Sequence, residues 1–396
     1  MQTKLLLIVN IVLASAALFD PEEELDSVGL IEYFGYPAET HVAETEDGFL
    51  LDVHRIPYGK NDSSAADRPV VIFQHGFGVA SDSWLVNLPN ESAPFVFADA
   101  GFDVWIGNSR GNKYTNHKEY TRANPGFWKF TYDQMAQYDL PALFDLVENV
   151  TGQSSVYYVG HSQGCFMMFA RLSFDPTFHQ RVKKFFALGP GPQMKHVGGP
   201  FKVLCSTDAV PVLHEVWNAA AYTEMGLGLT DPRIIGFLTD ATCRLQLEKE
   251  YCQTVEYVIV GESTTENVTR IPVYFKHFPA GTSTAALQHL CQTSNFGGFN
   301  YYQYPTSEEN LEAYGQLTPP AYDVSKINAP IYLYSSPADI VTTTIDLDEF
   351  LLPRINKSVV IQDNRITGFS HMDFQWSLNA TDLVYKPIIK TILEDF

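Results

Sequence analysis

The chain has 396 residues, a formal net charge of -20 and hydrophobic residues at 45% of its positions. This length allows one elaborated domain or two, and the composition is that of a globular protein. The strong negative charge argues against binding to nucleic acid and against electrostatic attachment to anionic membranes, and it suits solubility in an acidic fluid.

The N-terminus has the pattern of a secretory signal peptide. Lys4 precedes the mostly apolar run 5–13, and small residues follow it up to Ala17, near which we expect cleavage. The run is too short to span a bilayer comfortably, and no later segment reaches that length, so we expect a mature protein without a transmembrane anchor. An uncleaved anchor is the alternative.

N-x-S/T sequons support export, because such sites mark surface loops in secreted proteins. Six glycosylation candidates occur, at Asn61, Asn90, Asn149, Asn267, Asn356 and Asn379.

The five cysteines are compatible with disulfide bonds in an oxidising compartment. Cys243 and Cys252 are close enough to close a short loop and form the best candidate pair. The odd number leaves at least one free thiol unless a partner chain supplies another. Cys165 is expected to be packed in a helix rather than bridged, and the states of Cys205 and Cys291 stay open.

Apolar β-type runs alternate with helical stretches along the chain, which predicts an α/β fold with a mainly parallel sheet covered on both faces. The expected strands are 70–74, 102–106, 156–159, 185–188, 331–334 and 359–361, and the expected helices are 135–150, 166–172 and 383–393.

The alternation fades between about 189 and 319, where we expect an inserted cap that covers the site, with Gly226 and Gly228 allowing hinge motion. The expected organisation is a signal peptide at 1–17, core at 18–188, cap and lid at 189–319, and core again at 320–396. The alternative is that 189–319 simply continues the sheet domain.

A G-x-S-x-G motif follows the expected strand 156–159 directly, as Gly160-His161-Ser162-Gln163-Gly164. Such a motif places a serine on a sharp turn between a strand and a helix, with its Oγ held out at the edge of the sheet. An ordinary glycine-flanked turn is the alternative. A serine hydroxyl becomes a good nucleophile only with a base, an orienting acid and an oxyanion site.

The oxyanion site is expected after an early strand. The strand 70–74 ends at His75-Gly76, and a glycine there lets backbone N–H groups approach a developing negative charge. Such a donor contributes about 3–4 kcal/mol to lowering the barrier. We assign the two donors to the backbone N–H groups of Phe77 and Gln163; a plain strand-ending turn is the alternative.

The acid and the base are expected late in the chain. Asp339 follows the strand 331–334 closely, whereas its rivals Asp346 and Asp348 lie on a helical stretch and are expected to face solvent. His371 is the only histidine after Asp339, which fits the chain order Ser, Asp, His. Asp373 is expected to be structural.

Metal and cofactor chemistry find little support. His277 and His289 lack the H-E-x-x-H spacing, and the chain contains no C-x-x-C, G-x-G-x-x-G or phosphate loop. We therefore expect neither a metal nor a cofactor.

The chain resembles the acid lipase family, which includes gastric and lysosomal acid lipases. The matching stretches cover nearly the whole mature chain and include 34–37, 46–51, 74–76, 98–105, 107–112, 138–142, 160–164 and 371–374. The resemblance implies an α/β-hydrolase core with a helical cap and lid, hydrolysis of triacylglycerols or cholesteryl esters at acid pH, the triad Ser162, Asp339 and His371, and a disulfide between Cys243 and Cys252. The chain departs from the family pattern at 189–192, at Pro337-Ala338 and in the cap, which affects substrate preference rather than chemistry.

The sequence thus predicts a serine lipase of the secretory pathway, lysosomal or extracellular, that meets lipid esters at a droplet or micelle surface and binds no nucleic acid. Its oligomeric state is left open. The alternatives are an esterase for soluble short-chain esters, a lipid-binding protein without turnover, and a serine peptidase on the same core.

Overall fold

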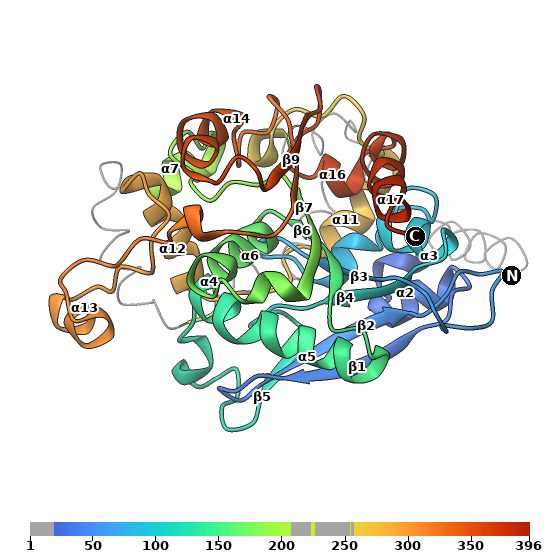
Figure 1. Cartoon of the computed structure of the whole chain (residues 1–396), viewed down its shortest axis with the longest axis horizontal. Coiled ribbons are helices and arrows are strands. Elements are labelled where there is room, and N and C mark those ends of the chain that lie inside the picture. The colour runs from blue at the N-terminus through green and yellow to red at the C-terminus, as the bar shows by residue number, and fades with distance from the viewer. Residues whose placement is uncertain (1–19, 207–222, 226–253, 255–256) are drawn as a thin grey trace, which may run out of the picture.

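The computed structural model describes residues 20–206, 223–225, 254 and 257–396 (Figure 1). The signal segment 1–17 and the four residues Gly226, Gly228, Cys243 and Cys252 lie outside the described residues. Among the residues that are described, no helix is both long and apolar enough to cross a bilayer.

One sheet runs through the centre of the molecule, with helices packed on both of its faces (Figure 1). Its strands are β1 (Glu39–Glu44), β2 (Phe49–Ile56), β3 (Val70–Gln74), β4 (Asp103–Gly107), β5 (Thr115–His117), β6 (Val156–His161), β7 (Val182–Leu188), β8 (Ile331–Ser335) and β9 (Val360–Arg365). The spatial order is β1-β2-β4-β3-β6-β7-β8-β9, with β5 paired to β2.

The sheet is parallel from β4 to β9 and antiparallel at the β1–β2 edge. The parallel strands β3, β4, β6, β7, β8 and β9 confirm the expected strands to within a few residues. The antiparallel strands β1, β2 and β5 were not predicted from the sequence.

The helices, in chain order, are α2 (Ser27–Tyr33), α3 (Ala93–Asp99), α4 (Tyr132–Gln134), α5 (Leu140–Thr151), α6 (Gln163–Phe174), α7 (Gly199–Cys205), α11 (Ile271–His277), α12 (Thr284–Asn295), α13 (Ser307–Tyr314), α14 (Thr344–Asp346), α15 (Leu352–Arg354), α16 (Asp373–Trp376) and α17 (Lys386–Leu393). The expected helix 135–150 consists of a π-helical turn, Met135–Asp139, followed by α5. A π-helical turn, Thr381–Tyr385, also precedes α17.

Alternation along a single strand explains the layers. On β3, Val70 and Ile72 join the core beneath α5 and α6, whereas Val71 and Phe73 join the core beneath α2, α3 and α17. Side chains alternate between the two faces of a strand, so a strand that is apolar at every position must be covered on both sides. This arrangement holds the carboxyl ends of the parallel strands at one rigid edge.

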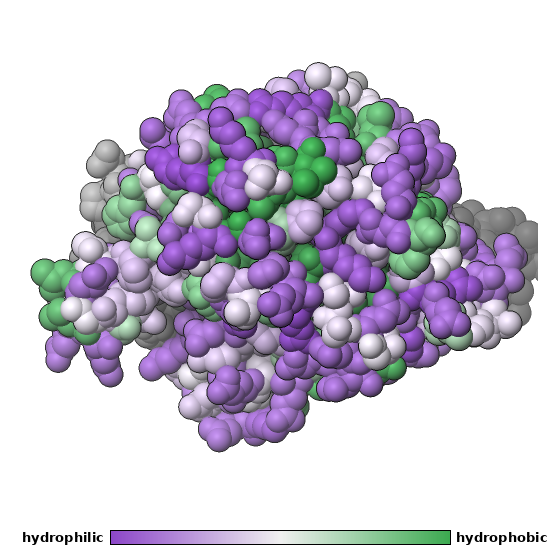
Figure 2. All heavy atoms as spheres, viewed as in Figure 1, coloured by the Kyte–Doolittle hydropathy of each residue, from purple (hydrophilic) through white to green (hydrophobic). Residues whose placement is uncertain are grey.

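Between β7 and β8 the described residues contain the helices α7, α11, α12 and α13 and no strand of the central sheet. On the face drawn in Figure 2 the surface is mostly hydrophilic, and apolar side chains gather in several places, one of them at the end of the molecule that carries α13. There Leu311 and Leu317 are 49% and 58% exposed.

Candidate active site

Ser162 stands at the sharp turn between β6 and α6. Its backbone has φ 51° and ψ -116°, a region that L-residues rarely adopt. Gly164 makes the turn possible, because a Cβ there would lie 2.6 Å from the backbone oxygen of Gln74 at the end of β3. The side chain of Ser162 is 7% exposed, and its backbone N–H donates to the carbonyl of Leu188 at 3.0 Å. Backbone strain of this kind concentrates at functional sites.

The structure brings Asp339 and His371 into direct contact. Asp339 follows β8 and His371 follows β9, and the Nδ1 atom of His371 lies 2.8 Å from Oδ2 of Asp339. The second carboxylate oxygen accepts hydrogen bonds from the backbone N–H groups of Val341 and Thr342, at 2.8 and 2.9 Å. These two backbone donors hold the carboxylate with its other oxygen facing the imidazole of His371.

Thr342 is a further residue of this cluster that sequence reasoning missed. Its hydroxyl lies 2.8 Å from Oδ2 of Asp339 and 2.9 Å from the carbonyl oxygen of Gly189. The single hydroxyl hydrogen serves one of these acceptors at a time. Threonine is common in turns, and nothing in the sequence around it marks this one.

His161 connects the serine turn to the loop that carries His371. Its Nε2 atom lies 2.9 Å from the backbone oxygen of His371, and the two rings are 4.8 Å apart. Burial lowers the pKa of His161 well below its ordinary value. Among the described residues no hydrogen bond joins Ser162 Oγ to His371, and catalytic hydrogen bonds are often long before substrate binds.

The loop after β3 lies directly against the serine. A Cβ on Gly76 would be 3.1 Å from the Cβ of Ser162, so a larger residue at this position would press on the serine. His75 fixes the next peptide group: its Nε2 accepts from the N–H of Ser109 at 3.0 Å, and its Nδ1 therefore donates to the carbonyl of Gly76 at 2.8 Å. Burial lowers the pKa of His75 to about 4, which keeps the ring neutral.

The orientation of that carbonyl also sets the Phe77 N–H. In a trans peptide the C=O and N–H point in opposite directions, so the N–H of Phe77 points away from His75. The N–H of Gln163 is the first of helix α6 and has no partner within the helix. Both expected donors thus belong to backbone segments packed around Ser162.

The rival residues have other partners. Asp346 accepts a hydrogen bond from His196, and Asp348 pairs with Arg365. Asp346 is buried, against the expectation that it faces solvent, because it bonds His196 and Thr343. Asp373 accepts from Ser263 and from the N–H of Ser370, as a structural residue would.

The described residues contain no cluster of three side chains able to hold a metal ion. Of the two histidines considered above, His277 contacts Asp82 and the carbonyl of Glu22, and His289 contacts the carbonyl of Asn300.

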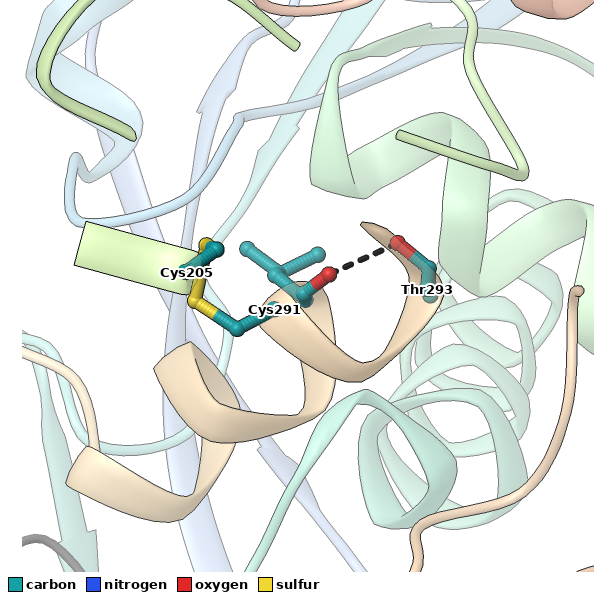
Figure 3. The surroundings of a disulfide bond; sticks show 4 residues. Cys205, Cys291 and Thr293 are labelled. Carbon is teal, nitrogen blue, oxygen red and sulfur yellow. Dashed lines mark hydrogen bonds between the residues drawn. A yellow bond between two sulfur atoms is a disulfide. The ribbon is translucent and has the colours of Figure 1, made fainter. Parts of the chain in front are cut away.

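A disulfide bond joins Cys205, at the end of α7, to Cys291 on α12 (Figure 3). The two cysteines are 86 residues apart, and no local sequence pattern indicates that they pair. Cys165 is free and buried, which confirms the expectation that it is packed; its Sγ lies 3.1 Å from the carbonyl of Gly160. The predicted pair Cys243 and Cys252 lies outside the described residues.

Five of the six sequon asparagines, all except Asn267, are exposed. Asn267 is 7% exposed, and its amide Nδ2 donates to a carboxylate oxygen of Glu91 at 2.8 Å.

Comparison with known proteins gives a consistent result. A family profile described as a partial alpha/beta-hydrolase lipase region matches residues 28–88, and one for the alpha/beta hydrolase fold matches residues 69–202. Lipase lipl-1 of Caenorhabditis elegans is 41% identical over 97% of this chain and 96% of its own length. Mouse gastric triacylglycerol lipase is 36% identical over 95% of this chain and 93% of its own length.

Among solved structures, potato epoxide hydrolase I is similar, with a TM-score of 0.53 at 14% identity, over 90% of this chain and all of that one. At this low identity the likeness concerns the fold alone. The fold, the serine turn and the full-length relatives lead to one conclusion: the chain belongs to the acid lipase family of α/β-hydrolases and is a lipase, a carboxylic ester hydrolase.

Proposed function

We propose that this lipase hydrolyses esters of long-chain fatty acids at acid pH through a triad of Ser162, His371 and Asp339. Triacylglycerols are the first substrate class, as the name of the gastric relatives suggests, and cholesteryl esters are the second. The 2.8 Å contact between His371 and Asp339, carried on loops beside the serine turn, is the observation that carries the proposal.

In the proposed reaction Ser162 Oγ attacks the ester carbonyl while Nε2 of His371 takes its proton. Asp339 accepts the hydrogen bond from Nδ1, which holds the imidazole in the required tautomer and stabilises its protonated form. The backbone N–H groups of Phe77 and Gln163 meet the negative charge on the carbonyl oxygen. His371 then gives its proton to the leaving alcohol, and the acyl group remains on Ser162.

The second half of the reaction reverses these roles. His371 takes a proton from a water molecule, whose oxygen attacks the acyl carbon. The bond to Ser162 Oγ breaks, the serine recovers its proton from His371, and the fatty acid leaves. His371 has to be neutral to start each half, and the neighbouring His161 is kept uncharged by burial, so it adds no second cation beside the base.

The inserted segment 189–319 is proposed as the cap and the surface that meets a lipid droplet or micelle. Several apolar side chains of this segment are strongly exposed, including Val203 at 63% and Phe296 at 60%. Exposed apolar side chains of this kind suit a transient contact with lipid. The signal-like N-terminus and the exposed sequons support entry into the secretory pathway, with the lysosome or the extracellular space as destination.

Hydrolysis of triolein, cholesteryl oleate and p-nitrophenyl butyrate, measured from acid to neutral pH, tests this proposal. We expect turnover of the triolein emulsion with an acid optimum, and its loss in Ser162→Ala, Asp339→Asn and His371→Gln. Ser307→Ala, an exposed serine on α13, is the matched control and keeps full activity. Turnover of the soluble butyrate ester alone would instead identify an esterase, and tight lipid binding without turnover would identify a carrier.

A further inference from the structure

A small apolar cluster surrounds the Cys205–Cys291 disulfide and is separate from the two cores of the sheet. Its third buried member is Leu287, one helical turn before Cys291 on α12; Cys205, Leu287 and Cys291 are 3%, 6% and 4% exposed. Because α7 is the first helix after β7, the disulfide fastens the start of the inserted segment to α12 (Figure 3).

This disulfide cluster reaches the loop that lies against the nucleophile. Phe77 packs both against the cluster and against the core beneath α5 and α6. It directly follows Gly76, where an added Cβ would lie 3.1 Å from the Cβ of Ser162. Phe77 therefore links the loop beside Ser162 to the disulfide cluster.

The rim of the cluster is apolar and incompletely covered. Phe77, Phe201, Leu204 and Met225 contact the cluster and are each only partly buried. On the other side of Ser162 lie the imidazole rings of His161 and His371, 4.8 Å apart. A methylene group gains about 0.8 kcal/mol when it leaves water for an apolar surface, so a long hydrocarbon chain would lie preferentially along the disulfide side.

We infer that the disulfide cluster and its rim form the wall along which the acyl chain of the substrate lies, with Phe77 at the inner end and Leu287 controlling chain length. This inference rests on the proposed ester hydrolysis at Ser162. The wall would hold the acyl chain rather than the alcohol. The alcohol leaves towards His371, which protonates it, whereas the wall borders Phe77 on the oxyanion side.

A chain-length series tests the wall directly. The values of kcat/KM are measured for p-nitrophenyl esters from butyrate to palmitate in the wild type and in Leu287→Trp. The larger side chain would occupy the space of the distal methylene groups. We expect the palmitate-to-butyrate ratio of kcat/KM to fall on the order of tenfold or more, in keeping with the effect of a few methylene contacts on specificity. Leu393→Trp, an exposed leucine at the end of α17 and outside the segment 189–319, is the control and leaves the ratio at the wild-type value.

A second variant covers the case in which the buried tryptophan prevents folding. Leu204→Asp changes a partly exposed side chain of the rim and places a charge where the hydrocarbon would lie, so the same ratio falls. Thermal unfolding and phosphonate labelling of Ser162 establish that each variant is folded. An unchanged ratio in a folded, labelled variant would overturn the acyl wall, while a wild-type protein that neither turns over esters nor takes up the phosphonate would overturn the proposed function itself.

Discussion

The Nε2 atom of His161 donates a hydrogen bond of 2.9 Å to the backbone carbonyl of His371. A carbonyl only accepts, so the proton of the neutral ring is on Nε2, and Nδ1 is a buried acceptor without a hydrogen-bond partner in the part of the chain that the structure describes. The residue before the proposed nucleophile thus fixes the backbone of the proposed base. The ends of β6 and of the loop after β9 are joined through this one imidazole.

Replacing His161 by alanine leaves the His371 carbonyl without its donor. We expect kcat/KM on p-nitrophenyl butyrate to fall about tenfold to a hundredfold, because a buried group that loses its partner costs about 1–3 kcal/mol. His161→Gln carries an N–H donor on a side chain of similar reach and should recover most of the loss. Equal activities of the alanine variant, the glutamine variant and the wild type would contradict a positioning role.

Thr342 provides a second test of how the acid is held. In Thr342→Val the shape is kept and the hydroxyl near Asp339 and Gly189 is lost. We expect kcat to fall about tenfold with little change in KM, because in the proposed mechanism Asp339 acts mainly on the imidazolium that forms during the reaction. Thr342→Ser should restore activity. A valine variant in which KM rises and kcat is kept would place Thr342 in substrate binding instead.

The raised pKa of the Asp373 carboxyl predicts that the stability of the protein depends on pH. Burial raises the pKa of its carboxyl from 3.8 to about 6, so the folded state binds this proton more tightly than the unfolded state. The free energy of unfolding therefore increases as pH falls from about 6 to about 4, by about 3 kcal/mol for this group. The effect ends once both states are protonated.

Asp373→Asn isolates this contribution, since the amide can still bond both Ser263 and Ser370. The difference in unfolding free energy between wild type and variant, from urea titrations at several pH values, should shift in favour of the wild type on acidification. A difference that is constant with pH would contradict the raised pKa.

The glycosylation pattern can be predicted from exposure. Asn267 is buried against Glu91, and a glycan added before folding would have to occupy that interior space. We expect the folded protein to carry glycans only at sequons other than Asn267. Peptide mass mapping after enzymatic deglycosylation detects occupied sites, and a glycan on Asn267 would show that the loop around it is arranged differently.

The strands that are buried along their whole length could be predicted from the sequence. β3 and β6 are buried at every position, so their unbroken apolar runs identify them. β2 was missed because polar residues interrupt it: Arg55 on this strand pairs with Asp103 on β4 through two hydrogen bonds of 2.8 Å. Pairing between strands that are distant in sequence cannot be seen from the local pattern.

The candidate site can be proposed from the sequence to the extent that motif and chain order constrain it. Ser162 is proposed from its motif, and His371 from being the only histidine after Asp339. No motif marks Thr342 or the Cys205–Cys291 pair. Their contacts form only when the fold brings distant segments of the chain together. The same holds for Asp346, whose burial depends on His196, 150 residues away.

Reaction with a serine-directed phosphonate tests the central claim most directly. Mass spectrometry of the labelled protein should find one adduct, on the peptide that contains Ser162, and this adduct should be absent in Ser162→Ala and form much more slowly in His371→Gln. An adduct on a different residue, or undiminished labelling in Ser162→Ala, would contradict the account.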